Sequence, residues 1–231
     1  MGPTALRYGV AASTRPVDEE GDGLTRLPDE YFDRMYFHSA DPWNVSRNWY
    51  ERRRHAILRA MLPQHRYRNA FEPGCSVGVL TELLAQRCDR VTATDVATAA
   101  LDGASRRLRA SGRRDQVTLL RRSLDEPWPP SGFDLVVLSE VAYYLAPETL
   151  RAVLDAEVPR LAPGATVVAS HWRRKIEGHP MSGDRANDII AATAGLHLIG
   201  SFRDADVVIE VFDTAGDASV AERSGMPAAA N

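Results

Sequence analysis

The chain has 231 residues, 44% of them hydrophobic, and a net charge of −3 with the histidines counted as neutral. This length suits a single α/β domain, and the hydrophobic content is high enough for a full core, which excludes an intrinsically disordered chain. The slightly acidic balance argues against nucleic-acid binding, and no apolar stretch approaches the ~18 residues that a membrane span requires.

The two ends of the chain differ in pattern from its middle. Residues 1–28 and 214–231 show no hydrophobic period, so we expect two flexible tails around one domain over 29–213. Cys75 and Cys88 are too few for a disulfide framework, and the N-terminus lacks the apolar core of a signal peptide. We therefore expect reduced thiols in a soluble cytoplasmic protein.

Strand and helix patterns alternate between the tails. In chain order, the sequence predicts a helix over 48–61, a strand over 70–72, a helix over 79–87, a strand over 90–94, a helix over 97–110, strands over 116–120 and 133–139, a helix over 147–160, a strand over 165–170, a helix over 182–194, and strands over 196–203 and 206–212. Alternating βα units require a mostly parallel sheet with helices on both faces. The last two strands leave no room for a helix between them, so they must form a hairpin. The predicted fold class is therefore α/β, doubly wound and Rossmann-like, with a mostly parallel seven-stranded sheet and an antiparallel C-terminal hairpin.

A glycine-containing loop with the sequence EPGCSVG follows the first predicted strand and precedes a helix. Small residues let the backbone approach a ligand, and the helix N-terminus offers free N–H groups. An acidic residue two places before the first glycine suits the cationic amino-acid end of S-adenosylmethionine, whereas a dinucleotide site has the pattern G-x-G-x-x-G. The alternative is a tight structural turn. The candidate cofactor residues of this loop are Glu72, Gly74, Cys75, Ser76 and Gly78.

A carboxylate ends the second predicted strand. Asp95, with Val96 beside it, lies about one βα unit after the glycine loop, where a carboxylate can accept both ribose hydroxyls. Asp95 can also cap the helix over 97–110, and the two roles are compatible. Ser123 and Leu124 follow the third strand, where the adenine ring would lie; the alternative there is an ordinary polar loop.

The fourth predicted strand ends in polar and aromatic residues. Ser139 and Glu140 close the strand over 133–139, and Tyr143 and Tyr144 follow. In open α/β sheets, ligands bind outside the carboxyl ends of the strands at the switch point, so these side chains are expected beside the cofactor and the reacting centre. The tyrosines could instead pack against the following helix.

A histidine and a tryptophan follow the fifth predicted strand. His171 and Trp172 come directly after residues 165–170, again at a carboxyl end. Imidazole can take up a proton near neutral pH, so His171 is a candidate base, with an ordinary polar loop residue as the alternative. Glu140 and Tyr144 are the other candidates to accept or orient the proton, and Trp43, Tyr143 and Trp172 are candidate substrate contacts.

Five arginines cluster on one predicted helix and just after it. No aromatic residue is interleaved with them, so we interpret them as a solvated helix face and predict no nucleic-acid partner. No His, Cys and carboxylate group has zinc-like spacing, which predicts no metal. These arginines are Arg106, Arg107, Arg109, Arg113 and Arg114.

Several of these segments resemble class I methyltransferases. The loop EPGCSVG, the strand end TATDVA, the segment FDLVVLSEVAYYL and the turn LAPG are similar to that class. The chain resembles the NodS-like family in three segments: SEVAYYL, Asp41-Pro42-Trp43 and Trp49-Tyr50-Glu51-Arg52-Arg53. That family is similar to the nodulation N-methyltransferases, which methylate the free amine of a chitooligosaccharide precursor. The resemblance runs from about residue 31 to residue 212.

The resemblance implies S-adenosylmethionine as cofactor and an N-terminal lid and helix over 29–65. Three positions depart from the usual pattern: Ser76 for a glycine of the loop, Ser123 for an acidic residue near adenine, and Ala165 for the second glycine of LAPGG. The sequence therefore predicts a methyltransferase acting on a small-molecule acceptor, an amine and possibly an amino sugar or oligosaccharide. The alternatives are a small-molecule O-methyltransferase, a nicotinamide-dependent dehydrogenase and a non-catalytic scaffold. The oligomeric state is left open.

Overall fold

The computed structural model describes residues 25–130, 132–174, 176–216, 219–223 and 225–226. Their strands form one seven-stranded sheet in the order β3-β2-β1-β4-β5-β7-β6. The strands are β1 (Tyr67–Pro73), β2 (Cys88–Asp95), β3 (Val117–Arg121), β4 (Leu135–Ser139), β5 (Thr166–Trp172), β6 (His197–Arg203) and β7 (Val207–Asp213). Strands β1 to β5 pair in parallel, and β7 lies antiparallel between β5 and β6. The predicted fold class, with its C-terminal hairpin, is confirmed.

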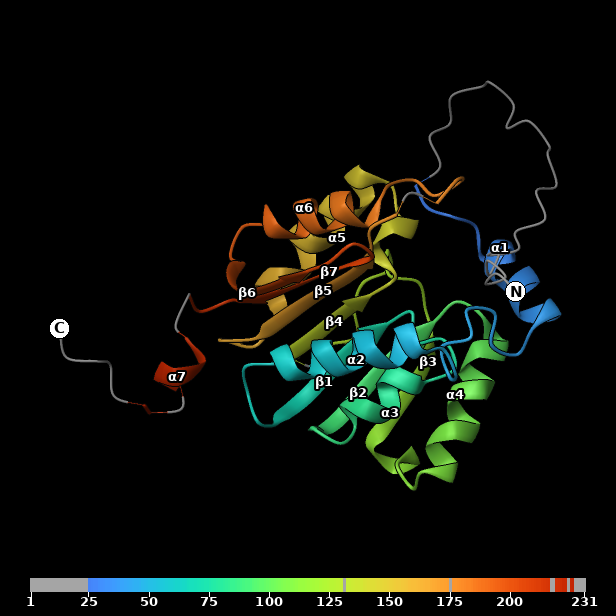
Figure 1. Ribbon diagram of the computed structural model, residues 1–231, viewed down its shortest axis with the longest axis horizontal. Helices are drawn as coiled ribbons and strands as arrows, with labels where there is room; N and C mark the ends of the chain where they lie inside the picture. The colour runs from blue at the N-terminus through green and yellow to red at the C-terminus, as the bar shows by residue number, and fades with distance from the viewer. Residues whose placement is uncertain (1–24, 131, 175, 217–218, 224, 227–231) are drawn as a thin grey trace, which may run out of the picture.

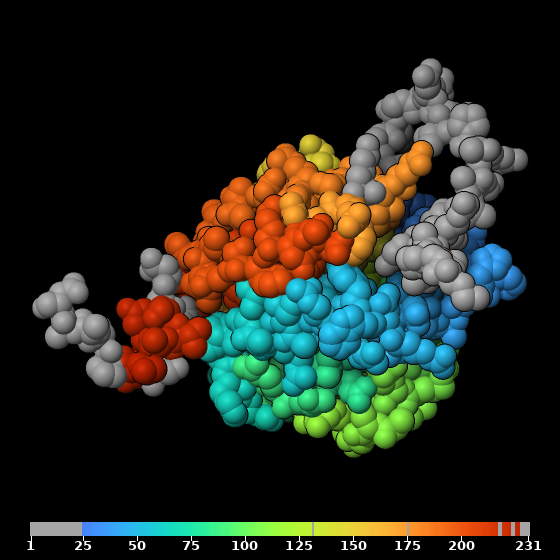
Figure 2. Space-filling view, viewed as in Figure 1, coloured from blue at the N-terminus to red at the C-terminus, as the bar shows by residue number. Residues whose placement is uncertain are grey.

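Helices cover both faces of this sheet. The helices are α1 (Asp29–His38), α2 (Trp49–Met61), α3 (Val79–Leu84), α4 (Thr98–Ala110), α5 (Pro147–Glu157), α6 (Gly183–Ala191) and α7 (Val220–Arg223). Helices α2, α3 and α4 lie on one face and α5 and α6 on the other, while α1 lies beside α4 at the end of the sheet (Figure 1). In the space-filling view, α2 lies next to the orange hairpin strands, which it contacts (Figure 2).

The central strand β4 shows how the sequence builds the two layers. Leu135 and Val137 pack in the cluster that includes residues of α2, α3 and α4. Val136 and Leu138 pack in the cluster that includes residues of α5 and α6. Because side chains alternate along a strand and both faces are covered, every position must be apolar, which explains the continuous hydrophobic run.

The helix starts follow the local chemistry of the sequence. The Asn48 side chain accepts a hydrogen bond from the backbone of Tyr50 at the start of α2, and Ser182 does the same for Arg185 at α6. The predicted ends are less accurate. The helix predicted over 79–87 ends at Leu84, and the helix predicted over 147–160 ends at Glu157 and continues as a 3-10 turn.

Strand β5 is longer than predicted. We expected it to end at Ser170, with His171 and Trp172 in the following loop, but both residues belong to the strand. The reason is the antiparallel partner: β7 extends the ladder so that His171 pairs with Val208 and Trp172 with Val207. His171 therefore has the fixed orientation of a strand residue.

Parts of both predicted tails make defined contacts. The backbone of Leu27 donates to the carbonyl of Tyr144, and Ala146 donates to the carbonyl of Thr25, so the predicted tail over 1–28 contains an ordered end. Near the other end, Thr214 donates to the carbonyl of Ala165, and α7 falls within the predicted tail over 214–231. Residues 1–24, which the prediction also included, lie outside the described residues.

Three further observations concern the described residues only. None of their helices combines the length and apolarity needed to cross a bilayer. No three of their His, Cys, Asp or Glu side chains gather as they would around a metal ion. Cys75 and Cys88 are both buried free thiols.

Candidate active site

The glycine loop has a backbone that favours residues without side chains. Gly74 has a φ of 71° and Gly78 a φ of 76°. A Cβ at Gly78 would lie 2.8 Å from the Cβ of Ala104, so glycine lets the start of α3 pack against α4. Ser76 has a φ of 49°, an unusual conformation for a residue with a side chain. The departure from glycine at this position is therefore strained and needs a compensating contact.

That compensating contact comes from the N-terminal segment. The hydroxyls of Ser76 and Tyr36 lie 2.7 Å apart in a hydrogen bond, which joins α1 to the glycine loop. The Tyr36 ring in turn packs edge-on against Trp43, with centroids 5.6 Å apart. Trp43, predicted as a substrate contact, thus has a packing role in this structure, and α1 lies over the loop where the resemblance places a lid.

Asp95 organises the loop from the neighbouring strand. Its Oδ2 accepts a hydrogen bond from the Ser76 N–H at 2.9 Å, and its Oδ1 accepts one from the Ala97 N–H at 2.9 Å. Burial raises the pKa of Asp95 to about 6, against the lowering effect of these backbone donors. A carboxylate has about four acceptor positions, so both oxygens retain capacity for the hydroxyls of a ribose. The N-cap of α4 is Ala97, so the predicted capping role of Asp95 is wrong: its carboxylate bonds the Ala97 N–H one residue before the helix begins. This contact leaves acceptor positions for the predicted ribose role.

Glu72 is a buried carboxyl near the end of β1. It is 3% exposed, and its Oε2 is buried without a hydrogen-bond partner. Burial raises the pKa of Glu72 to about 8, and the nearby Asp95 raises it further, while Arg54 lowers it. A buried carboxylate with an unpaired oxygen is costly unless a ligand completes it. An ammonium group would do so.

The residues of the predicted adenine loop are buried or hydrogen-bonded within the protein. Leu124 is 4% exposed and belongs to the core that includes α5 and α6. The Ser123 hydroxyl donates to Asp125, and the Ser123 N–H donates to Glu126 at 2.8 Å. Val96, half-buried after β2, has its carbonyl engaged by Arg121 at 2.8 Å. These residues lie at the predicted edge, with their polar groups already paired within the chain.

Glu140 occupies a strained turn directly after β4. Its φ is 57°, in the left-handed region, and its N–H donates to the carbonyl of Ser170 at 2.9 Å. The Tyr143 hydroxyl donates to Glu140 Oε2 at 2.6 Å. Glu140 Oε1 is buried without a hydrogen-bond partner. The turn therefore places the Glu140 carboxylate at the carboxyl edge of the sheet, with one buried oxygen that makes no hydrogen bond.

His171 is placed differently from its prediction. It is 0% exposed, its Nδ1 lies 2.7 Å from Asn187 Oδ1, and its Nε2 accepts the N–H of Ala142 at 3.3 Å. Burial lowers the pKa of His171 to about 4, against the raising effect of Asn187, so the ring is neutral near pH 7. Both ring nitrogens are thus occupied within the protein.

The tyrosines after β4 join an aromatic cluster. The rings of Tyr143 and Tyr144 lie 4.8 Å apart, and His179 lies 5.2 Å from the first and 4.9 Å from the second. Phe32 of α1 packs edge-on against Tyr144 at 4.9 Å. Trp172, predicted as a substrate contact, packs edge-on against Tyr50 of α2 at 5.0 Å.

Two charged residues of α2 also belong to this edge, and sequence reasoning gave them no role. Arg54 is 3% exposed and donates to Glu51 Oε2 at 2.6 Å and to Ser139 Oγ at 2.5 Å. Its Nε lies 3.7 Å from Glu140 Oε1. One signal was available: Arg54 lies four residues after Tyr50 and four before Leu58, on the core-facing side of the helix, where a charge is unusual.

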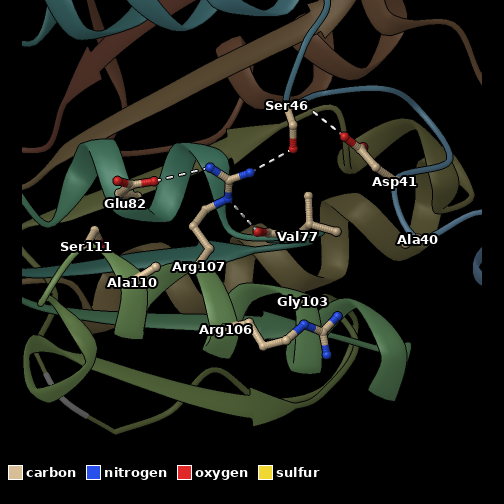
Figure 3. Close-up of a pocket in the computed structure, with 10 residues that line it drawn as sticks. All are labelled: Ala40, Asp41, Ser46, Val77, Glu82, Gly103, Arg106, Arg107, Ala110 and Ser111. Carbon is tan, nitrogen blue, oxygen red and sulfur yellow. Dashed lines mark hydrogen bonds and ion pairs between the residues drawn. The ribbon is translucent and has the colours of Figure 1, made fainter.

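A hollow of about 620 Å³ lies on the α3 and α4 side of the glycine loop, and none of the predicted site residues lines it. Arg107 crosses it, donating to the Val77 carbonyl at 3.1 Å, to Ser46 at 2.7 Å and to Glu82 at 3.3 Å (Figure 3). Asp41 accepts from the Ser46 N–H in turn. Arg107, predicted to lie on a solvated helix face, instead ties the N-terminal segment to the glycine loop. The reason is that its half-buried side chain reaches from α4 to Val77 and Ser46, whereas Arg106 and Arg109 are exposed.

Comparison with known proteins identifies the family to which this chain belongs. A family model described as Nodulation protein S (NodS) matches residues 30–194, more than half of the chain. The chain belongs to the NodS family. Nodulation protein S of Rhizobium tropici is 35% identical over 130 residues, which are 55% of this chain and 53% of that protein. Nodulation protein S of Bradyrhizobium diazoefficiens is 28% identical over 194 residues, 80% of this chain and 91% of that protein. The chain thus aligns with about half of the first relative's length and most of the second's.

A solved structure agrees with the sequence match. The crystal structure of N-methyltransferase NodS from Bradyrhizobium japonicum WM9, in complex with S-adenosylhomocysteine, superposes with a TM-score of 0.70 at 28% identity. The match covers 80% of this chain and 96% of that one. The predicted class I methyltransferase fold and the predicted NodS-like family are confirmed.

Proposed function

We propose that this chain is an S-adenosylmethionine-dependent N-methyltransferase whose acceptor is the amine of a small molecule, of the amino-sugar or oligosaccharide class. The observation that carries the amine assignment is the Glu140 carboxylate, which presents one buried oxygen without a hydrogen-bond partner at the carboxyl edge of the sheet. Membership of the NodS family and the likeness to an N-methyltransferase structure support the predicted activity and cofactor.

The residues of the glycine loop and of β2 fit this cofactor. The unpaired Oε2 of Glu72 suits an ammonium, and the spare acceptor positions of Asp95 suit ribose hydroxyls. The loop N–H groups at the start of α3 suit a carboxylate. When bound, the cofactor supplies a methyl group made electrophilic by its sulfonium. The chain's own contribution is to hold donor and acceptor in line and exclude water, which is a proximity effect.

The charges around Glu140 favour a cationic acceptor. Arg54 is shared between two carboxylates, Glu51 and Glu140, and so balances only one of them. Burial, with Arg54 adding to it, lowers the pKa of the neighbouring His55 to about 2, so that residue adds no positive charge. Burial raises the pKa of Glu51, against the lowering effect of Arg54, so the cluster gains a net negative charge as pH rises and both carboxylates ionise. Such a site attracts an amine that arrives protonated.

An amine must lose its proton before it attacks the methyl group. Among the three candidate bases, His171, Glu140 and Tyr144, Glu140 has an oxygen, Oε1, that makes no hydrogen bond. We therefore assign Glu140 the proton, or the hydrogen bond that orients the nitrogen lone pair. The Tyr143 hydroxyl fixes the other carboxylate oxygen. We assign Tyr144, within the aromatic cluster, to shaping the acceptor site. His171, whose two nitrogens are already bonded, orients the backbone after β4.

The placement of His171 also bears on the alternatives. A hydroxyl acceptor would need a stronger base than an amine, and His171 was the residue predicted to supply it. Its burial between Asn187 and the backbone of Ala142 disfavours that O-methyltransferase reading. A dehydrogenase would need the G-x-G-x-x-G turn, which the EPGCSVG loop lacks.

Two measurements test the proposal. Calorimetric titration should show that the protein binds S-adenosylhomocysteine and does not bind NAD; binding of NAD alone would overturn the cofactor assignment. With labelled S-adenosylmethionine, a panel of glucosamine and chitosan oligomers should accept label, whereas their N-acetylated counterparts, which keep every hydroxyl, should not. Equal labelling of both panels would place the methyl group on oxygen.

A further inference from the structure

Arg54 is a buried cation whose contacts extend beyond its effect on the charge of the site. Its Nε and Nη2 donate to Glu51 Oε2 at 3.2 and 2.6 Å, and its Nη1 donates to Ser139 Oγ at 2.5 Å. A longer Nη1 contact reaches Ser170 Oγ at 3.4 Å. The side chain thus spans from α2 to the carboxyl ends of β4 and β5.

Docking of α2 alone does not explain this arginine. Burying a charged pair costs desolvation energy that apolar residues avoid, and such a pair is often no more stable than a hydrophobic replacement. One turn further along the same helix face, Leu58 packs into the core without polar partners. An arginine at position 54 therefore suggests a task that leucine could not perform.

The contacts of Arg54 surround the turn that carries Glu140. Ser139, which accepts from Arg54, immediately precedes Glu140, and Ser170 accepts the Glu140 N–H with its carbonyl. The Arg54 Nε to Glu140 Oε1 distance is 3.7 Å, an ion-pair distance that leaves the oxygen free of a direct hydrogen bond. Arg54 thus holds the backbone beneath the carboxylate and attracts the carboxylate itself.

The other groups near Glu140 cannot replace this cation. Glu51 of α2 is a second carboxyl, and Tyr143 is a neutral donor to the opposite oxygen. Tyr144 is also neutral, because burial raises its pKa. His171 on β5 is neutral because burial lowers its pKa to about 4. Within the described part of the chain, the positive partner recorded for Glu140 is Arg54.

We propose that Arg54 is a positioning residue that holds the Glu140 carboxylate in the acceptor site, with Glu51 fixing the guanidinium from behind. This inference rests on the proposed role of Glu140 in methyl transfer. It makes the orientation of the acceptor depend on α2, a helix of the N-terminal segment.

A double-mutant cycle tests the inference directly. The variants are Arg54→Met, Glu140→Gln and the two combined, with Arg54→Lys as the conservative rescue. Arg53→Met is the matched control, because Arg53 is the next residue of α2 and pairs with Asp204 of the β6–β7 turn. Each protein is measured for unfolding by urea, for S-adenosylhomocysteine affinity, and for kcat and KM with glucosamine oligomers.

If Arg54 acts through Glu140, the two substitutions are not additive in the unfolding midpoint or in kcat/KM. Arg54→Met should lower kcat/KM by roughly tenfold or more, the scale of close charge-pair coupling. S-adenosylhomocysteine affinity should fall by less, through loss of the lowering effect of Arg54 on the pKa of Glu72. Arg54→Lys should restore most of the loss, and Arg53→Met should change neither quantity. Should Arg54→Met fail to fold, the same cycle is run on a Glu51→Gln background, which removes the carboxylate left unpaired.

The outcomes separate this inference from the function on which it rests. Additive effects in the unfolding cycle, or an Arg54→Met enzyme with unchanged kcat/KM, would overturn the positioning role. If the unmodified protein methylates no amine of the panel, the proposed function fails, and the unfolding cycle alone decides whether Arg54 and Glu140 are coupled.

Discussion

The glycine loop and the rim around Glu140 lie at the same edge of one sheet, but different kinds of contact hold them. Asp95 organises the glycine loop by bonding to Ser76, 19 residues before it, and to Ala97, two residues after it. On the rim, Arg54 bonds to Ser139 and Ser170, which are 85 and 116 residues away. The backbone of the cofactor half is therefore set within one βαβ unit, to which α1 adds the Tyr36 contact with Ser76. The acceptor half exists only once α2 has docked on the finished sheet.

We expect Glu140→Gln to give the largest difference between the acceptor half and the cofactor half of the site. The substitution keeps the size of the side chain and removes its charge, and base assistance is worth about 10²–10⁴-fold in rate. We expect kcat/KM for an amine acceptor to fall at least about a hundredfold, with unchanged affinity for S-adenosylhomocysteine. Steady-state kinetics and calorimetry measure the two quantities. Glu148→Gln, at an exposed glutamate of α5, is the matched control. A loss of cofactor affinity alone would assign Glu140 to the other half.

Asp95→Ala is expected to affect the opposite half. Each hydrogen bond to a charged group contributes about 1.5–3 kcal/mol, so losing those to the ribose should weaken cofactor binding at least roughly tenfold. The control is Asp102→Ala, an exposed aspartate on α4. Calorimetry on both variants gives the dissociation constants, and circular dichroism confirms folding. If a folded Asp95→Ala protein bound the cofactor normally, only the contacts to Ser76 and Ala97 would remain as the role of Asp95.

The pH dependence of cofactor binding sharpens the comparison further. The pKa of Glu72 is raised to about 8, so near pH 7 the carboxyl is largely protonated and cannot pair with an ammonium. Affinity for S-adenosylhomocysteine should therefore rise severalfold as pH increases from about 6 towards 8, and Glu72→Gln should remove that rise. Calorimetry across this range tests the sign, and an affinity that falls with pH would contradict the placement of the ammonium at Glu72.

The unliganded protein should show the opposite trend from the same group. A carboxyl whose pKa is higher when folded than when unfolded stabilises the fold fully below its unfolded pKa, and that contribution is lost as pH rises through the folded value. For Glu72 the folded value is about 8, so the melting temperature without ligand should fall between about pH 5 and pH 8. Thermal melts of the wild type and Glu72→Gln would show whether this carboxyl is responsible.

His171→Ala should have the smallest effect on catalysis. Removing the ring leaves the Asn187 Oδ1 and the Ala142 N–H unpaired in a buried site, which costs about 1–3 kcal/mol of stability. We expect a lower melting temperature and a kcat within a few fold of the wild type, because the ring supplies no free nitrogen. His197→Ala, at an exposed histidine of β6, is the control. A kcat reduced a hundredfold, with loss of one limb of the pH–rate profile, would restore His171 as the base.

Most of the fold could be predicted from the sequence because the signals for its elements are local. The apolar run of β4, the Asn48 and Ser182 caps, and the Pro147 start each depend on neighbours within a few residues. The end of β5 was misplaced because its last two residues, His171 and Trp172, pair with Val208 and Val207 of β7, 37 and 35 positions later in the chain. The pattern of residues 165–172 cannot reveal such a distant partner.

The residues of the candidate site also differ in whether local sequence defines them. Glu72, Asp95 and the glycine pattern could be identified because one turn and the next strand end define them. The burial of His171 and the guanidinium between Glu51 and Glu140 depend on which helix covers which strand end, so they emerged only from the assembled structure. A charged residue on the buried face of an amphipathic helix was the sequence signal that could have pointed to Arg54.

The left-handed backbone at Glu140 has a consequence for anyone who selects this protein for heat resistance. A residue with a side chain at a φ of 57° is strained, and such conformations cost about 1–3 kcal/mol unless glycine occupies the position. A screen that rewards only thermostability would therefore favour Glu140→Gly wherever the relief of strain outweighs the lost contacts of the carboxylate with Tyr143 and Arg54. Enzymes selected in this way would melt at higher temperature while losing the carboxylate that meets the acceptor, so such a screen needs an activity filter at this codon.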